Sequence, residues 1–140
     1  MKELADFIRQ GERFAVLSHI SPDGDTMGSA AALIFALRKS GKQAQWFCEG
    51  EVPEGYRKIP EIAMLTSCEK LKKIDSVICV DVSSEDRLGN CTELFRRVPR
   101  RAVIDHYKTN TGFADVNVIR DRNAAGFAVM ELLDELQVPL

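Results

Sequence analysis

The sequence predicts an α/β fold, a three-layer α/β/α sandwich around a mostly parallel sheet of about five strands. Nearly continuous apolar runs, such as SVICVDV at residues 76–82, are typical of strands buried on both faces of a parallel sheet. These runs alternate with segments whose apolar residues recur at helical spacing. The 140 residues, 45% hydrophobic and 29% charged, are suited to one globular domain.

The first third of the chain contains two predicted helices and two predicted strands. A short amphipathic helix that Gly11 ends is followed by the strand RFAVLSH at 13–19. A helix at 26–40 and the strand QAQWFCE at 43–49 come next. The apolar residues that define the two helices are Leu4, Phe7, Ile8, Met27, Ala30, Ala31, Ile34 and Leu37.

The rest of the chain continues the alternation. Residues 50–73 contain short helical pieces separated by prolines and a glycine. The strand at 76–82 is followed by RAVIDH at 101–106, a weaker strand at 114–119 and a final helix at 123–136. This order predicts a Rossmann-like sheet with right-handed crossovers, in which the ends of consecutive strands meet at one ligand-binding edge.

Composition excludes several classes of protein. The net charge of -2 lacks the electrostatic footprint of a general duplex-binding protein. Four nearby arginines could form a local basic patch, but a solvated helix end and loop is the preferred interpretation (Arg96, Arg97, Arg100 and Arg101). The N-terminus has no signal-peptide core, and no apolar run reaches the roughly 18–20 residues of a membrane span. We therefore expect a cytoplasmic protein without a membrane partner.

The four cysteines form no C-x-x-C pair and are predicted to be free thiols in a reducing compartment (Cys48, Cys68, Cys79 and Cys91).

Both histidines and four aspartates lie where predicted strands end. His19 ends the first strand, Asp81 follows the apolar core of the third, and Asp105 and His106 end the fourth. Asp23 and Asp25 follow His19 within one loop. Because the carboxyl ends of parallel strands share an edge, the sequence predicts that these six side chains converge.

Buried carboxylates need partners of opposite charge. The neighbouring loops offer only Arg87 and Lys108, so divalent cations are the simpler solution. Imidazole and carboxylate ligands suit manganese, zinc or iron, and manganese best where oxygen ligands predominate. Two such ions about 4 Å apart could clamp a phosphoryl oxygen and activate a water molecule.

Each residue alone also has a structural interpretation. P-D-G-D is a strong turn sequence in which Asp25 or Thr26 could cap the next helix. His106 could be a packed histidine, and Asp81 could end its strand by capping a loop. The coincidence of three strand ends favours the metal site. Gly28 and Ser29 could present backbone N–H groups to a phosphate, or could only let the helix pack closely.

The motif H-x-x-P-D-G-D-x-x-G-S at 19–29, the strand-ending Asp81 and V-I-D-H at 103–106 resemble the DHH phosphoesterase superfamily. Within it, the chain is most similar to the RecJ-like group that includes nanoRNase/pAp-phosphatase enzymes, and TNTGFADVN at 109–117 fits that group. The resemblance implies hydrolysis of phosphoester bonds with two manganese ions. Its implied substrates are short oligonucleotides, 3′-phosphoadenosine 5′-phosphate, cyclic dinucleotides or single-stranded DNA.

The resemblance also implies a role for each site residue. His19 and Asp23 would hold one metal, Asp25 and His106 the other, and Asp81 would bridge the two. Asp105 would lie behind the ligands and orient an imidazole.

Two departures from the family follow. The third motif reads Asp105-His106-Tyr107, where the family has a second histidine that contacts the phosphate, so a lower rate is expected. The resemblance also implies that residues 1–140 are a single DHH-type catalytic domain, and we expect the chain to be truncated before a further ligand and a second, substrate-binding domain.

The leading prediction is therefore a two-metal phosphoesterase domain acting on a nucleotide or short single-stranded oligonucleotide. The alternatives are a metal- or nucleotide-binding module without catalysis and a manganese inorganic pyrophosphatase. The expected protein partner is a second copy or a missing C-terminal half, although the apolar stripe of the last helix could equally pack on its own sheet (Phe127, Met130, Leu132, Leu133 and Leu136).

Overall fold

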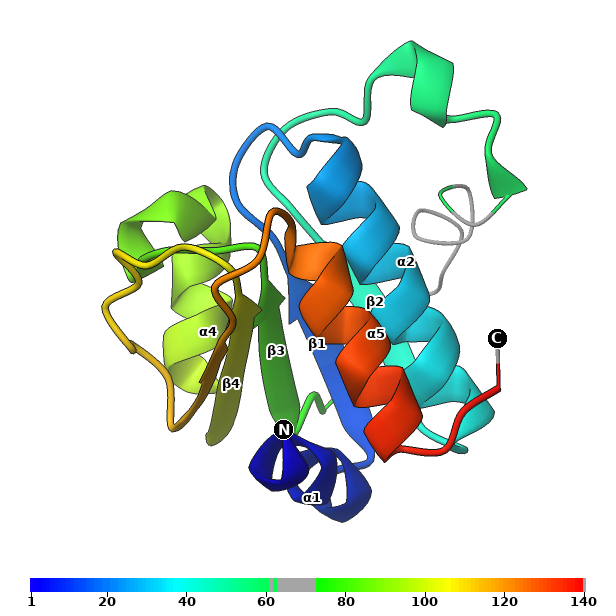
Figure 1. Cartoon of the computed structure of the whole chain (residues 1–140). Helices are drawn as coiled ribbons and strands as arrows, with labels where there is room; N and C mark the ends of the chain where they lie inside the picture. Colours follow the sequence, from blue (N-terminus) through cyan, green and yellow to red (C-terminus); the bar gives the residue numbers. More distant parts are fainter. Residues whose placement is uncertain (61, 63–72, 140) are drawn as a thin grey trace.

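The computed structural model describes residues 1–60, 62 and 73–139. Five strands form one all-parallel sheet in the order β2-β1-β3-β4-β5 (Figure 1). The predicted α/β class and its strands are thus confirmed. The strands are β1 (Arg13–Leu17), β2 (Gln43–Phe47), β3 (Ser76–Val80), β4 (Arg100–Asp105) and β5 (Val116–Ile119).

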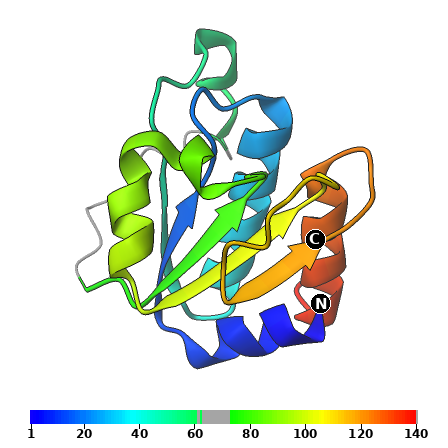
Figure 2. The ribbon, with the colours of Figure 1, turned by 90° about the vertical axis from the view of Figure 1, so that its left-hand side faces the viewer.

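Helices cover both faces of the sheet. Helices α2 and α5 lie side by side on one face, whereas η2 and α4 cover the other (Figures 1 and 2). Helix α1 lies below the edge where the strands begin. The helices are α1 (Lys2–Gln10), α2 (Gly24–Lys39), η1 (Glu54–Tyr56), η2 (Glu85–Cys91), α4 (Thr92–Arg97) and α5 (Ala125–Glu135).

Alternate side chains of the strands enter two separate cores, as the two-residue period of a strand requires. On β1, Phe14 and Val16 pack in the core beneath α2 and α5. Ala15 and Leu17 pack in the core beneath η2 and α4. Because both faces are covered, the middle residues of the central strands are apolar, which explains the continuous runs in the sequence.

Gly11 ends α1, but it does so with an extended backbone at φ -92°. A Cβ atom there would lie 2.5 Å from Phe14 Cζ and 2.7 Å from Ser76 Oγ. The Arg100 guanidinium lies 2.6 Å from the same point, so a larger residue here would have to displace these packed side chains, and a left-handed helix end is not the reason for the glycine.

The four arginines do not belong to one solvated loop, so that interpretation is only partly correct. Arg96 and Arg97 end α4, whereas Arg100 and Arg101 are the first residues of β4. The guanidinium of Arg100 lies 4.2 Å from the centre of the Phe7 ring and donates to the Phe7 carbonyl. Arg100 thus fastens α1 to the sheet and is not available as part of a basic patch.

The remaining predictions concern thiols and apolar surface. Cys48, Cys79 and Cys91 are free, while Cys68 lies outside the described residues. Of the short helical pieces predicted at 50–73, η1 is present, and 61 and 63–72 also lie outside the described residues. In the described part of the chain, none of the helices has the length and apolarity to cross a bilayer.

The apolar stripe of the last helix is divided between core and surface. Leu132 and Leu133 are buried against the sheet. Phe127 and Met130 are 55% and 53% exposed.

Candidate metal centre

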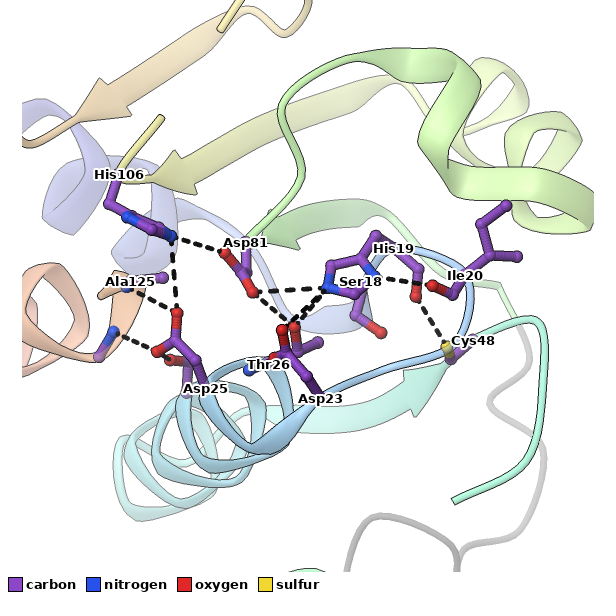
Figure 3. A network of polar contacts seen from close by, with 12 residues as sticks. Ser18, His19, Ile20, Asp23, Asp25, Thr26, Cys48, Asp81, His106 and Ala125 are labelled. Atoms are coloured by element: carbon purple, nitrogen blue, oxygen red, sulfur yellow. Dashed lines mark hydrogen bonds and ion pairs between the residues drawn. The ribbon is translucent and has the colours of Figure 1, made fainter. Parts of the chain in front are cut away.

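The candidate site lies at the edge where the parallel strands end. Strands β1, β3 and β4 end within two residues of His19, Asp81 and His106, respectively. Asp23 and Asp25 come from the start of α2, the helix that follows β1 (Figure 3). The sheet therefore brings the polar side chains of one loop, His19, Asp23 and Asp25, together with the distant Asp81 and His106.

Asp81 lies at the centre of the site, with a side chain that is 1% exposed. Its φ of 59° is a left-handed conformation that costs most non-glycine residues about 1–2 kcal/mol. Its Oδ1 atom is 3.2 Å from Nε2 of His106, and Oδ2 is 3.6 Å from Nε2 of His19. One buried carboxylate therefore lies between two imidazoles (Figure 3).

The His19 ring is held by its own loop. Nδ1 lies 2.7 Å from the carbonyl oxygen of Ile20, and the thiol of Cys48 donates to the carbonyl of His19 at 3.2 Å. Nε2 faces the Thr26 hydroxyl oxygen at 2.8 Å, Oδ2 of Asp81 at 3.6 Å and Oδ2 of Asp23 at 3.9 Å. This nitrogen is thus the atom that could bind a metal ion.

Helix α2 begins at Gly24, two residues before the predicted start at Thr26. Oδ1 of Asp23 accepts a hydrogen bond of 2.9 Å from the backbone N–H of Thr26 and caps the helix. The predicted cap at Asp25 or Thr26 is therefore wrong. Because Oδ2 of Asp23 still faces His19, the cap and a metal contact use different oxygens of one carboxylate.

Asp25 connects α2 to the start of α5. Its two oxygens accept hydrogen bonds from the backbone N–H groups of Ala125 and Gly126, at 3.0 and 3.1 Å. The N-cap residue of α5 makes no side-chain cap of its own, so Asp25 supplies it from another helix. Oδ2 of Asp25 also lies 3.7 Å from Nε2 of His106, whose Nδ1 is 3.2 Å from the carbonyl oxygen of Arg122.

These side chains form two groups that could each hold a metal ion. In each group the ligand atoms all lie within 4.8 Å of one another, and Asp81 belongs to both. The groups are His19, Asp23 and Asp81, and Asp25, Asp81 and His106. The structure thus places together the side chains that the family resemblance assigned to each metal, and their role as ligands stays a prediction.

The surroundings of Asp81 fit a divalent cation. Oδ1 of Asp81 is buried and receives no hydrogen bond from the described residues. Lys108, one alternative counterion, is 78% exposed and pairs with Asp121 at 3.2 Å. Arg87, the other, is exposed. A carboxylate-rich set with two imidazoles is the donor chemistry of manganese, iron or zinc sites.

The expectation for Gly28 and Ser29 needs correction. Because α2 begins at Gly24, these residues lie in its second turn, where helix geometry directs backbone N–H groups to carbonyls four residues earlier. The Ser29 hydroxyl donates to Oδ1 of Asp25 at 3.2 Å. A Cβ atom at Gly28 would meet nothing within 4 Å, so glycine is not needed here for close packing either.

Asp105 is fully buried and is held by Asn110, a partner that sequence reasoning missed. Nδ2 of Asn110 donates to Oδ2 of Asp105 at 2.8 Å and to the carbonyl of Val82 at 2.9 Å. Burial raises the pKa of Asp105, an effect that the Asn110 hydrogen bond only partly offsets. The group that contacts Nδ1 of His106 is the Arg122 carbonyl, whereas Asn110 links Asp105 to Val82, so the orienting role expected of Asp105 stays a prediction.

Residues 13–137 match the model of the DHH family, N-terminal domain. The chain belongs to the DHH family. Within the family, it is 30% identical over 128 residues to the bifunctional oligoribonuclease and PAP phosphatase NrnA of Thermus thermophilus. That alignment covers 88% of this chain and 37% of NrnA, so the chain spans little more than a third of this curated relative.

Solved structures of other proteins share the fold of this DHH domain. An exopolyphosphatase-related protein from Bacteroides fragilis superposes with a TM-score of 0.82 at 19% identity, over 96% of this chain and 42% of that protein. Exonuclease RecJ bound to manganese superposes with a TM-score of 0.64 at 22% identity, over 97% of this chain and 37% of RecJ.

The third motif of this DHH domain ends in Tyr107, whose side chain faces solvent in part. The residue is 38% exposed, and its ring centre lies 4.2 Å from that of His106. Partial burial raises the pKa of the Tyr107 hydroxyl, and the negative charges of Asp81 and Asp105 raise it further. The hydroxyl therefore remains protonated near neutral pH and can donate a hydrogen bond.

The stability of the metal-free DHH domain should depend on His19. The contact with the Asp81 carboxylate raises the pKa of His19 above its usual 6.5, although burial opposes this. A histidine whose pKa is higher in the folded state than in the unfolded state stabilises the folded protein. The full stabilisation is present below the unfolded-state pKa, and it is lost as pH rises through the folded-state pKa. The free energy of unfolding should therefore fall as pH rises above about 6.5.

Urea unfolding in EDTA between about pH 6 and 8.5 would measure this dependence in wild type and in His19→Gln. The difference between the two proteins should shrink as pH rises. A difference that stays constant over the range would contradict the assignment.

Proposed function

We propose that this DHH domain hydrolyses phosphoester bonds of short oligonucleotides or of 3′-phosphoadenosine 5′-phosphate by a two-metal mechanism. The observation that carries the proposal is the position of Asp81, whose two oxygens face His106 and His19 at 3.2 and 3.6 Å. A carboxylate with one oxygen toward each ligand group is suited to bridge two cations.

The proposed roles follow the two groups of side chains. His19 and Asp23 would hold one cation, Asp25 and His106 the other, and Asp81 both. Mn²⁺ is the preferred ion because carboxylate oxygens outnumber the imidazoles. When bound, the ions supply positive charge for the phosphoryl oxygens and activation of a water molecule.

The protein itself contributes orientation. The anchored ring of His19 and the helix-capping carboxylates of Asp23 and Asp25 are already fixed by hydrogen bonds in this structure. Ligand groups that are held in place lose little further freedom when an ion or a substrate binds.

The substrate class is inferred from a relative. NrnA, which is 30% identical over most of this chain, is described as an oligoribonuclease and PAP phosphatase. Because the chain spans 37% of NrnA, we carry over this activity only as a proposal.

Tyr107 is proposed to contact the scissile phosphate through its hydroxyl, where a histidine could also carry charge. Tyr107→His should therefore raise phosphodiesterase activity by about tenfold or more, since positioned acid–base groups contribute 10²–10⁴-fold. Initial rates with Mn²⁺ would measure the gain, and Tyr107→Phe should lower the rate. If fully metal-loaded Tyr107→His gains nothing, the phosphate-contact role is wrong.

The activity itself is tested with a panel of substrates. Wild type and Asp81→Ala are incubated with Mn²⁺ and a di- to pentanucleotide, 3′-phosphoadenosine 5′-phosphate or pyrophosphate, and release of mononucleotide or phosphate is followed. We expect wild type to hydrolyse the oligonucleotide or 3′-phosphoadenosine 5′-phosphate, and Asp81→Ala to hydrolyse neither. Release from pyrophosphate alone would replace the proposal by a pyrophosphatase.

A metal- or nucleotide-binding module is the second candidate, and the tyrosine at position 107 favours it. In that case calorimetry would detect Mn²⁺ binding, while the three substrates would remain intact.

A further inference from the structure

Thr26 lies between the ligand groups, in the first turn of α2, and is fully buried. Its hydroxyl oxygen is 2.5 Å from Oδ2 of Asp81 and 2.8 Å from Nε2 of His19. Its backbone N–H donates to Oδ1 of Asp23 at 2.9 Å. One residue that the motif leaves unassigned thus contacts all three members of the His19 group (Figure 3).

We infer that Thr26 is a positioning residue that fixes the rotation of the Asp81 carboxylate between the two metal positions. This inference rests on the metal-dependent function proposed above. The ionised carboxylate has no hydrogen to donate, so in their hydrogen bond the Thr26 hydroxyl is the donor. With Oδ2 held by that bond, Oδ1 turns toward His106 and the second group.

The position of Thr26 in the first turn of α2 also determines which group its hydroxyl bonds. Threonine in a helix has two favoured side-chain rotamers because its hydroxyl can bond a carbonyl of the preceding turn. In the first turn of α2 that bond is replaced by the contact with Asp81. The helix cap at Asp23 and the hydroxyl contact at Asp81 therefore hold the start of α2 against the end of β3.

A valine would fill the same volume without supplying a donor. Oδ2 of Asp81 would then be buried without its partner, and the carboxylate would be free to rotate. Serine would keep the donor and lose only a methyl group. Comparison of the two substitutions separates the hydroxyl from the packing.

Calorimetric titration with MnCl₂ tests the inference. Thr26→Val should weaken Mn²⁺ binding by about 10–100-fold, the range found when groups that orient metal ligands are removed, and Thr26→Ser should restore most of it. Thr92→Val is the matched control, because it removes a hydroxyl that bonds the Gly89 carbonyl away from the site, and it should bind as wild type does.

The outcomes separate this inference from the function on which it rests. Thr26→Val with wild-type affinity, or Thr26→Ser as weak as Thr26→Val, would overturn the role of the hydroxyl while leaving the metal site intact. A wild type that binds no Mn²⁺ would overturn both. A crystal structure of metal-free Thr26→Val adds a direct readout, since a changed side-chain rotamer of Asp81 is expected and an unchanged one would contradict the inference.

Discussion

Asp81→Asn should weaken Mn²⁺ binding at both positions together, by roughly 100-fold or more, because loss of a group that only orients ligands already costs 10–100-fold. Asp81 is shared by the His19 group and the His106 group, so neither keeps its full set of ligands. Asparagine is the suitable replacement, since it tolerates the positive φ of this position better than most residues. Phosphoester hydrolysis should be lost with the metals.

Calorimetry with MnCl₂ would give the stoichiometry and affinity of each variant. Asp75→Asn is the control, because Asp75 holds the chain at the opposite edge of the sheet by accepting hydrogen bonds from the backbone of Glu12 and Arg13. It should leave both metal positions unchanged. If Asp81→Asn weakened only one of the two positions, the bridging assignment would be wrong.

Asp25→Ala should reduce both metal binding and the stability of the metal-free protein. The carboxylate accepts the first free N–H groups of α5, and loss of a helix cap costs about 0.5–2 kcal/mol. For a domain of this size, we expect the melting temperature in EDTA to fall by roughly 2–8 °C. The second metal position would also lose one of its three ligands.

Thermal unfolding with and without Mn²⁺ separates the two effects. Asp6→Ala is the control, since Asp6 is an exposed carboxylate that pairs only with Arg9 on the same helix among the described ion pairs. It should change the melting temperature by no more than about 2 °C. An unchanged melting temperature for Asp25→Ala in EDTA would mean that the cap contributes nothing.

The sheet and its functional edge could be predicted because burial on both faces leaves a clear pattern. VICV at 77–80 and AVI at 102–104 are apolar throughout, and the polar residues that follow each core mark the place where a strand emerges. This is why His19, Asp81 and His106 could be assigned to one edge before their distances were known.

The layer formed by η2 and α4 was missed, although Leu88, Cys91 and Phe95 recur at a spacing that helices use. Its segment contains a glycine at φ 58°, Gly89, where the helical turns are interrupted. A short pattern broken in this way does not stand out from a loop.

The start of α2 was misplaced for a different reason. P-D-G-D offers two aspartates as caps, and local sequence does not decide which one the tertiary structure uses. Asp25 is taken by α5, a helix 100 residues away, and the cap falls to Asp23. The contacts of Thr26 and Asn110 are long-range hydrogen bonds of the same kind, which carry no periodic signal.

The central claim is that one carboxylate lies between two metal positions at the end of β3. Anomalous diffraction at the manganese edge, from crystals of this domain soaked in MnCl₂, measures this directly. We predict two peaks, one among His19, Asp23 and Asp81 and the other among Asp25, Asp81 and His106. No peak within bonding distance of Asp81 would contradict the account.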